Sequence, residues 1–188
     1  MTGKFLITGL PRSRTAWLAV AATRANVICH HEPSAWLKDP DDLTRLWNEP
    51  NHVVGISDSA LGIILPELLQ AHGPRTLIVK RSPEAVRSSV AAYLAAGGLS
   101  VADADLSRRL ARLGSVLASC ENSPLVRVVE FESLRHIETV KSVLSWLTPG
   151  APLPGLLGQL MHMNVQSDLD YNLAAATTSR QWWMPADL

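Results

Sequence analysis

Residues 5–18 read FLITGLPRSRTAWL, and this stretch decides the fold that we expect. It opens with apolar and β-branched residues typical of a buried strand, turns through a short loop, and continues with the apolar spacing of a helix. A loop in that position directs unpaired backbone N–H groups and the positive end of a helix dipole at one point. Two arginines, Arg12 and Arg14, and two hydroxyl side chains, Ser13 and Thr15, in the loop are donors suited to phosphate or sulfate. The stretch therefore predicts an anion site.

The loop departs from the Walker motif of ATPases and GTPases. That motif reads GxxxxGK followed by serine or threonine, but counting from Gly9 puts Arg14 at its second glycine and Thr15 at its lysine. A plain ATPase or GTPase therefore fits poorly. The alternative is a solvated loop whose arginines make surface salt bridges, and the clustering of the arginines with hydroxyl groups disfavours it.

Beyond this loop, short runs rich in β-branched residues alternate with longer segments of helical period. This alternation predicts an α/β fold, with three layers as in P-loop proteins and a central, mostly parallel sheet flanked by helices. The expected strands cover residues 5–8, 26–29, 53–57, 76–80 and 125–130. The expected helices cover residues 15–24, 60–71, 83–96, 101–120, 133–147 and 156–163.

Length and composition indicate one ordinary globular domain over residues 1–188, with a core at about 4–147 and a C-terminal helix and tail at 148–188. The 17 basic and 17 acidic side chains cancel, which excludes the broad positive surface of a non-specific nucleic-acid or membrane binder. No apolar run approaches the ~18 residues of a membrane span, and no signal peptide precedes the first strand, so we expect a cytoplasmic protein. Cys29 and Cys120 are expected to be free core thiols.

A second informative stretch, residues 76–89, reads TLIVKRSPEAVRSS. Arg81 leaves the carboxyl end of an expected strand, and Ser82 and Pro83 are typical of a helix start. Ser89 lies on that helix, so the loop and the helix can share one phosphate. The alternative is an exposed helix cap.

The two stretches in this order, about seventy residues apart, resemble the sulfotransferase family. The family's first loop has the form P-(K/R)-S-G-T-(T/S)-(W/L), and residues 11–17, PRSRTAW, match it at five of seven positions. Two positions depart from this form. Arg14 stands in place of the glycine, a residue that permits a positive φ or a close approach to the ligand, and Ala16 stands in place of a hydroxyl residue. The second stretch is similar to the family's strand followed by an Arg-x-Pro helix start and a later serine.

A third stretch, VVEFESL at residues 128–134, is similar to the family's late strand. Its Glu130 and Glu132 are expected to cap and orient neighbouring groups rather than to catalyse. The resemblance thus spans about residues 4–147. The family's C-terminal R-K-G segment is not found. Arg180, beside Trp182 and Trp183, is a candidate substitute for it.

The resemblance implies transfer of a sulfuryl group from 3′-phosphoadenosine 5′-phosphosulfate (PAPS) to a hydroxyl or amine of a small-molecule acceptor, with no metal required. It implies that Arg12 stabilises the charge that grows on the bridging oxygen. It also implies a cofactor-binding set. This set comprises Arg12, Ser13, Arg14, Thr15, Ala16 and Trp17 around the 5′ end, and Arg81 and Ser89 at the 3′-phosphate. Core packing is the alternative role for Trp17.

The general base is less well defined. Many family members place a histidine shortly after the strand that corresponds to residues 53–57, where this sequence has Asp58. Asp58 can accept a proton if burial raises its pKa, and it can equally cap the helix that follows. His30, His31 and Glu32 end the second expected strand, at the edge where open α/β sheets bind ligands, and each can serve as the base or bind the acceptor.

The expected catalytic residues are accordingly Arg12, Asp58 and His31, and no metal site is expected. Two adjacent histidines on a strand end point in opposite directions, and no further ligands follow at suitable spacing. Two other functions compete with sulfuryl transfer. One is a P-loop nucleotide or small-molecule kinase in which Asp58 organises Mg²⁺, and the other is a non-catalytic nucleotide-binding protein. The acceptor and the oligomeric state do not follow from the sequence.

Overall fold

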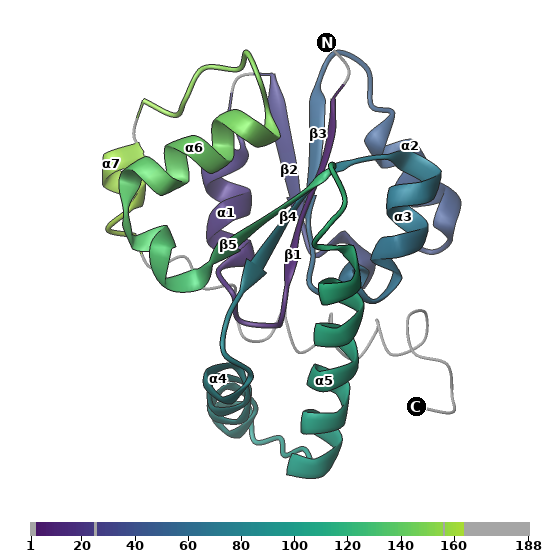
Figure 1. Cartoon of the computed structure of the whole chain (residues 1–188), viewed down its shortest axis with the longest axis vertical. Coiled ribbons are helices and arrows are strands. Elements are labelled where there is room, and N and C mark those ends of the chain that lie inside the picture. Colours follow the sequence, from purple (N-terminus) through teal and green to yellow (C-terminus); the bar gives the residue numbers. More distant parts are fainter. Residues whose placement is uncertain (1–2, 25, 156, 164–188) are drawn as a thin grey trace.

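The computed structural model describes residues 3–24, 26–155 and 157–163. In this part of the chain five strands form one sheet in the order β2-β3-β1-β4-β5, and every neighbouring pair runs parallel (Figure 1). The α/β class is thus confirmed, with a sheet that is parallel throughout. The strands are β1 (Lys4–Gly9), β2 (Val27–His31), β3 (Val53–Ser57), β4 (Arg75–Lys80) and β5 (Val126–Glu130).

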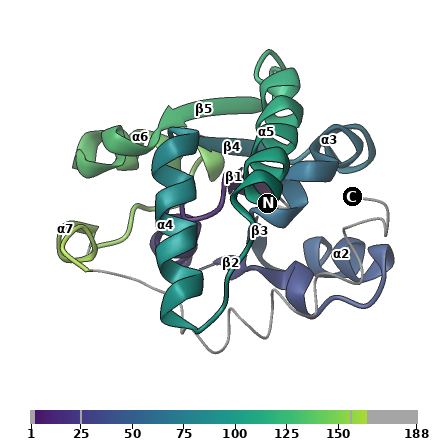
Figure 2. The same ribbon diagram turned by 90° about the horizontal axis from the view of Figure 1, so that it is seen from below.

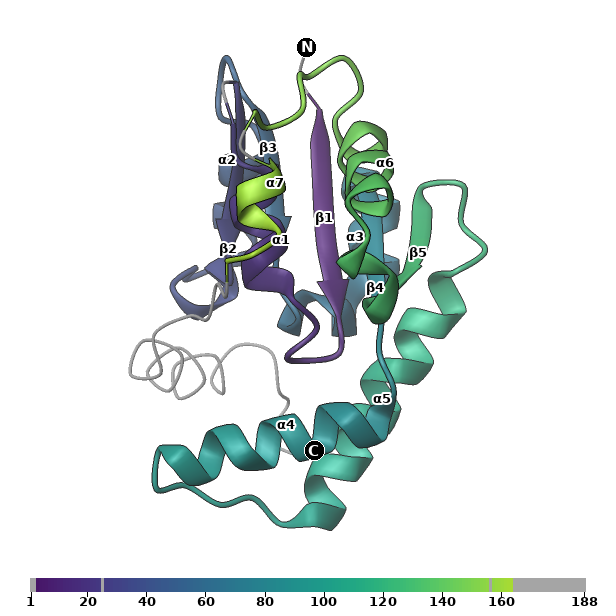
Figure 3. The ribbon, with the colours of Figure 1, turned by 90° about the vertical axis from the view of Figure 1, so that its left-hand side faces the viewer.

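Helices cover both faces of the sheet, which is why its central strands are continuous apolar runs. One face carries α1 (Thr15–Ala22), α6 (Ile137–Leu147) and α7 (Leu157–Leu160), and the other carries α2 (Pro40–Trp47), α3 (Leu65–His72) and α5 (Asp103–Cys120) (Figures 1 and 3). Successive side chains of β1 point to opposite faces. Ile7 therefore packs with α1 and α6, whereas Leu6 packs with α3 and α5. These are the expected three layers.

The carboxyl ends of β1 and β3 lie at the position where open α/β sheets commonly bind ligands. The chain leaves β1 for α1 on one face and leaves the neighbouring β3 for α3 on the other face. Where two adjacent parallel strands send their connections in opposite directions, a crevice opens outside their carboxyl ends. The loop at residues 10–14 and the segment after β3 border that point.

Helix α4 (Pro83–Ala96) lies across the carboxyl ends of the strands, apart from both layers (Figures 2 and 3). A small third core cluster joins it to the body, in which Leu10 of the loop after β1 packs with Val86 of α4 and with Leu106 and Leu110 of α5. Val86 is the one fully buried residue of α4, all of which the structure describes. The helix thus covers the site with little of its own surface in the core.

Most of the predicted helices are confirmed, and the departures have local causes. The prediction for residues 83–96 is correct at both ends. Ser82 caps the start of this helix, its Oγ accepting the N–H of Ala85 at 3.2 Å, and Gly97 follows its last residue. The predicted helix at 60–71 divides into a 3₁₀ helix (Ala60–Ile64) and α3. Pro66 lies in the first turn of α3, where a proline fits, whereas in a helix interior it removes a hydrogen bond.

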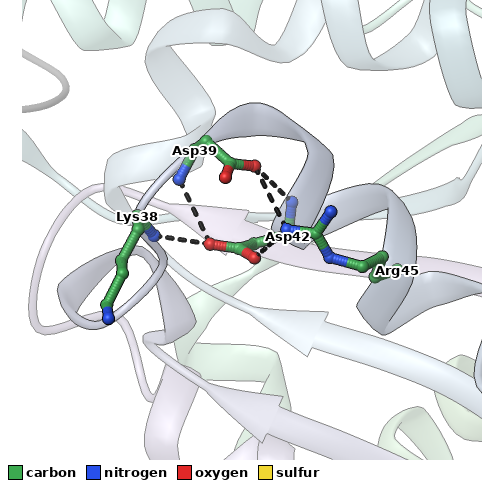
Figure 4. A network of polar contacts seen from close by, with 4 residues as sticks. All are labelled: Lys38, Asp39, Asp42 and Arg45. Atoms are coloured by element: carbon green, nitrogen blue, oxygen red, sulfur yellow. Dashed lines mark hydrogen bonds and ion pairs between the residues drawn. The ribbon is translucent and has the colours of Figure 1, made fainter.

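Helix α2 lies where the apolar spacing predicts no element, because capping rather than periodicity defines it. Asp39 accepts the N–H of Asp42 at 2.9 Å, and Asp42 accepts the N–H of Asp39 at 3.2 Å (Figure 4). Asp42 also accepts the N–H of Lys38 at 2.7 Å and pairs with Arg45. The signal in the sequence is DPDD at residues 39–42: an acidic N-cap, a proline, and an acid three residues after the cap.

Cys29 and Cys120 are buried free thiols, as expected. Burial raises the pKa of the Cys29 thiol, so this group stays protonated and packs as an apolar residue. Within the described ranges, none of the helices combines the length and the apolar character that a bilayer span requires.

Candidate functional site

The loop between β1 and α1 holds two arginines in the left-handed backbone region. Arg12 has φ 65° and Arg14 has φ 62°. This conformation costs a non-glycine residue about 1 to 2 kcal/mol, which explains why the resembling loops have glycine at the position of Arg14. The loop begins at Gly9, where a Cβ would lie 2.5 Å from the carbonyl oxygen of Val79. Backbone strain of this kind concentrates at ligand sites.

Replacing Arg14 by glycine should give a protein more stable than replacing it by alanine, by about 1 kcal/mol. Both variants lose the guanidinium and its contacts. The difference between their free energies of unfolding therefore reports only the backbone conformation at φ 62°, which glycine adopts without strain. Urea unfolding measures the difference. The matched control is Arg87 inside right-handed α4, where alanine should be the more stable replacement by a similar amount. Equal stabilities of the two Arg14 variants would contradict the strained loop.

Ser13 places a hydroxyl group at the centre of this loop. The residue is 0% exposed, and among the described residues its Oγ has no hydrogen-bond partner. A buried polar group without a partner costs about 1 to 3 kcal/mol, and a bound oxyanion would remove that cost. Thr15 and Ala16 open α1 beside it, and Ser57 fixes this helix start by donating from its Oγ to the Thr15 carbonyl at 2.8 Å. The loop therefore offers several donors to one anion.

The two sequence motifs meet at the carboxyl edge of the sheet. The Arg81 guanidinium, which follows β4, donates to the carbonyl oxygen of Arg12. Arg12 Nε in turn donates to the Oγ of Ser89 on α4 at 3.4 Å, and its guanidinium lies 4.9 Å from the ring centroid of Tyr93. Residues 69 and 77 positions apart in the sequence thus come together.

Two guanidinium groups lie next to the half-buried ring of Phe131, and a third arginine, Arg12, adjoins one of them through its backbone. Arg81 lies 4.3 Å and Arg14 5.5 Å from the ring centroid, and the Arg81 guanidinium contacts the backbone carbonyl oxygen of Arg12. Burial lowers the pKa of Arg81; Glu132 opposes this shift, and Arg12 and Arg14 add to it. In the part of the chain that the structure describes, none of the three forms an ion pair with a carboxylate. Gathered cations repel one another, so this cluster is suited to an anion.

Trp17 packs in the core. It is 4% exposed, and its Nε1 donates to a backbone carbonyl of α7 at 2.8 Å. Its ring meets the cluster only through the Arg14 guanidinium, 5.8 Å from the ring centroid. Of the two roles considered for Trp17, the structure favours core packing. The candidate substitute for the R-K-G segment, Arg180 with Trp182 and Trp183, lies outside the described residues.

Glu32 is the carboxylate that accompanies these cations. It follows β2 at the same edge with φ 47°, and its N–H donates to the Ser57 carbonyl at 2.9 Å. Its side chain is 29% exposed. Burial first, and then the Asp58 carboxylate, raise the pKa of Glu32 to about 7, while the Arg12 guanidinium opposes the rise. A solvent-accessible carboxylate that exchanges its proton near neutral pH is suited to general base catalysis.

Asp58 lies buried behind Glu32, with only 1% of its surface exposed. Its Oδ2 accepts the N–H of Ser34 at 3.0 Å, and its Oδ1 accepts the N–H groups of Ala60 at 2.8 Å and Leu61 at 3.4 Å. Burial raises the pKa of Asp58 against the effect of these hydrogen bonds. Because the carboxylate is enclosed and occupied by backbone donors, the structure favours the capping role of Asp58 over the role of base.

The two histidines at the end of β2 have different neighbours, as their positions on a strand predict. His31 Nδ1 lies 3.8 Å from Glu32 Oε2. His30 Nε2 lies 3.9 Å from Glu49 Oε2, and the His30 ring meets the Trp36 ring edge-on. Burial lowers the pKa of both histidines, so both are mainly neutral at pH 7. His31 therefore adjoins the candidate site through Glu32.

The third motif contributes to the site through residues other than its glutamates. Glu130 and Glu132 are exposed. Phe131 between them packs against two guanidiniums, and the carbonyl oxygen of Leu134 accepts a hydrogen bond from Arg14 at 3.4 Å. Neither Phe131 nor Tyr93 was predicted as a site residue. Tyr93 lies one helical turn beyond Ser89, and this i, i+4 spacing was the available signal.

Comparison with solved structures finds sulfotransferases that are similar over nearly the whole chain. A sulfotransferase from Alicyclobacillus acidocaldarius gives a TM-score of 0.63 at 14% identity, covering 96% of this chain and 95% of that one. Mouse sulfotransferase SULT7A1, complexed with PAP, gives 0.60 at 14% identity over 96% of this chain and 66% of that one. The sulfotransferase domain from the curacin biosynthetic pathway gives 0.55 at 12% identity, over 99% and 93%.

No family model and no curated protein matches the sequence. The structural similarity confirms the fold that the motifs indicate: this chain has a sulfotransferase-like α/β fold with a parallel sheet in the order 2-3-1-4-5. A fold hosts many functions, so the function has to be argued from the residues of the site.

Proposed function

We propose that this protein is a sulfotransferase that moves a sulfuryl group from PAPS to a hydroxyl or amine of a small acceptor. The observation that carries the proposal is the convergence of Arg12, Arg14 and Arg81, without carboxylate partners among the described residues, at the carboxyl edge of a sulfotransferase-like sheet. Three cations at one place match a ligand with anionic groups at both its 3′ and 5′ ends.

The donors of the site divide into two groups that fit the two ends of such a nucleotide. Ser13, Thr15 and the first N–H groups of α1 hold the 5′ end, and the buried Ser13 Oγ gains the partner that it lacks. Arg81 and Ser89 hold the 3′-phosphate, and the buried Arg81 Nε likewise gains an acceptor. Arg12 directly precedes Ser13 in the chain, and it contacts both residues of the 3′ group, Arg81 through its carbonyl oxygen and Ser89 through its Nε.

We assign the general base to Glu32. PAPS supplies an activated sulfuryl group, whose bond to the 5′-phosphate oxygen breaks as a bond to the acceptor oxygen or nitrogen forms. Glu32 takes the acceptor's proton and therefore has to be ionised. Because its pKa is about 7, activity is expected to rise with pH through that region. Asp58 is enclosed, and His31 adjoins the cations only by way of Glu32, so both are weaker candidates.

Thermal unfolding tests the ligand. PAP at 100 times its dissociation constant should stabilise the protein by about 2.7 kcal/mol, which raises Tm by about 5 to 10 °C for a chain of this size. The shift should persist in EDTA. A kinase would instead respond to ATP with Mg²⁺, and PAP binding without turnover across a broad acceptor panel would indicate a non-catalytic protein.

Arg81→Ala should raise the Kd of PAP by about 10- to 100-fold, as expected for the loss of a charge-assisted hydrogen bond. The Kd of adenosine 5′-phosphate, which lacks the 3′-phosphate, should change much less. Calorimetric titration with both nucleotides measures this. Arg108→Ala is the matched control, since Arg108 is exposed on α5 and pairs with Asp105. Equal losses for the two nucleotides would contradict the assignment of Arg81 to the 3′-phosphate.

A further inference from the structure

Asp58 joins the ends of two strands. Its carboxylate follows β3 and accepts N–H groups from Ala60 and Leu61 on one side, and from Ser34 in the turn after β2 on the other. Glu32 lies in that same turn, two residues before Ser34, and its own N–H donates to Ser57, the neighbour of Asp58. The two carboxylates are therefore tied to one backbone frame.

We propose that Asp58 is a positioning residue for Glu32: it fixes the turn that presents the Glu32 carboxylate beside Arg12, and it supplies a negative charge behind that carboxylate. This inference rests on the proposed role of Glu32 as proton acceptor. It changes the role of Asp58 from a candidate base to a group that acts through another residue.

The backbone of Glu32 has a conformation that its surroundings must hold in place. Glu32 has φ 47° and ψ 48°, a left-handed conformation that costs a non-glycine residue about 1 to 2 kcal/mol. Such a conformation persists only where the surroundings over-determine it. Three of the four non-glycine residues with positive φ in the described ranges are Arg12, Arg14 and Glu32, and all three lie at this edge of the sheet. The hydrogen bond from Ser34 to Asp58 fixes the chain directly after Glu32.

The charges around Glu32 predict the direction in which its pKa should change when Asp58 is made neutral. The groups that face it are Asp58 after β3, Arg12 after β1, and His31 on its own strand at 3.8 Å. His31 is mainly neutral at pH 7, because burial lowers its pKa. A neighbouring negative charge disfavours ionisation of a carboxyl group, and a positive charge favours it. Removing the charge of Asp58 while keeping Arg12 should therefore make Glu32 easier to ionise.

The test is the NMR titration of the Glu32 side-chain carboxyl carbon, without nucleotide or acceptor, in the native protein and in two neutral variants. Asp58→Asn keeps the size of the side chain, and Asp58→Ser keeps an oxygen that caps a helix. In both variants the midpoint should lie at lower pH than the native midpoint of about 7. Glu49→Gln is the matched control, because Glu49 faces His30 and should leave the midpoint unchanged.

A midpoint that stays in place or rises in both neutral variants would overturn the inference. If neither variant folds, the native titration decides, because two coupled carboxylates titrate as a pair and the Glu32 signal should also respond at the Asp58 midpoint; a Glu32 signal with a single independent step would contradict the coupling. The pH profile of kcat/KM gives the functional counterpart, in which the acid limb should move with the NMR midpoint. A shifted midpoint in a protein without sulfuryl transfer would refute the proposed function alone.

Discussion

Arg12→Ala is expected to lower kcat for sulfuryl transfer by about 10²- to 10³-fold, the range found when one donor to a developing negative charge is removed. Arg12 directly precedes Ser13 of the proposed 5′ group, and its guanidinium contacts Ser89 of the proposed 3′ group and the ring of Tyr93. In the ground state Arg14 and Arg81 share the attraction for the nucleotide, so PAP affinity should fall by less than about tenfold. Steady-state kinetics and calorimetric titration separate the two quantities.

Two further variants control this experiment. Arg12→Gly tolerates the positive φ at this residue and should lose as much kcat as the alanine variant, which excludes backbone strain as the cause. Arg12→Lys keeps the charge and should recover part of the loss. If kcat and PAP affinity fall by the same factor, Arg12 is a binding residue rather than a catalytic one.

Glu32→Gln is expected to lower kcat/KM at pH 8 by about 10²- to 10⁴-fold, the usual contribution of a positioned general base. PAP binding should be unchanged or tighter, because the substitution removes a negative charge from a cationic site. The native protein should show an acid limb in its rate profile with a midpoint at about pH 7, since only the ionised carboxylate accepts a proton, and the variant should lose this limb. A pH series of initial rates measures both effects.

His31→Gln provides the comparison for the assignment of the base. His31 contacts Glu32 at 3.8 Å, and its loss should cost less than the loss of Glu32. A larger loss in the His31 variant, together with a persistent acid limb in Glu32→Gln, would transfer the role of base to His31. Glu49→Gln, which removes a carboxylate beside His30, should leave the rate unchanged.

The layers of the fold and the loop after β1 are predictable from the sequence because both depend on local patterns. The run at residues 5–18 contains a strand, a loop and a helix start, and the structure has all three. Arg81 and Ser89 are predictable at one edge of the sheet because Pro83 fixes where the helix after Arg81 begins, and in the structure both contact Arg12. Parallel strands then bring separate loops to one edge of the sheet, so two motifs that are distant in sequence meet in space.

The group suited to act as base was not singled out from sequence, because the difference between Glu32, His31 and Asp58 is one of environment. All three lie at the ends of neighbouring strands, and only the folded chain shows that Asp58 is enclosed and Glu32 is open. Phe131 and Tyr93 escaped prediction for a related reason. Aromatic rings are usually core residues, and their role here depends on guanidinium groups from other segments.

Helix α4 has only Val86 fully buried among its fourteen residues, yet it carries Ser89 and Tyr93 against Arg12. Most substitutions on this helix therefore threaten neither the sheet nor its two main cores, because stability is lost chiefly where buried side chains change. Residues of α4 other than Val86 can therefore be exchanged to vary what lies beside Arg12 at little cost to the free energy of unfolding.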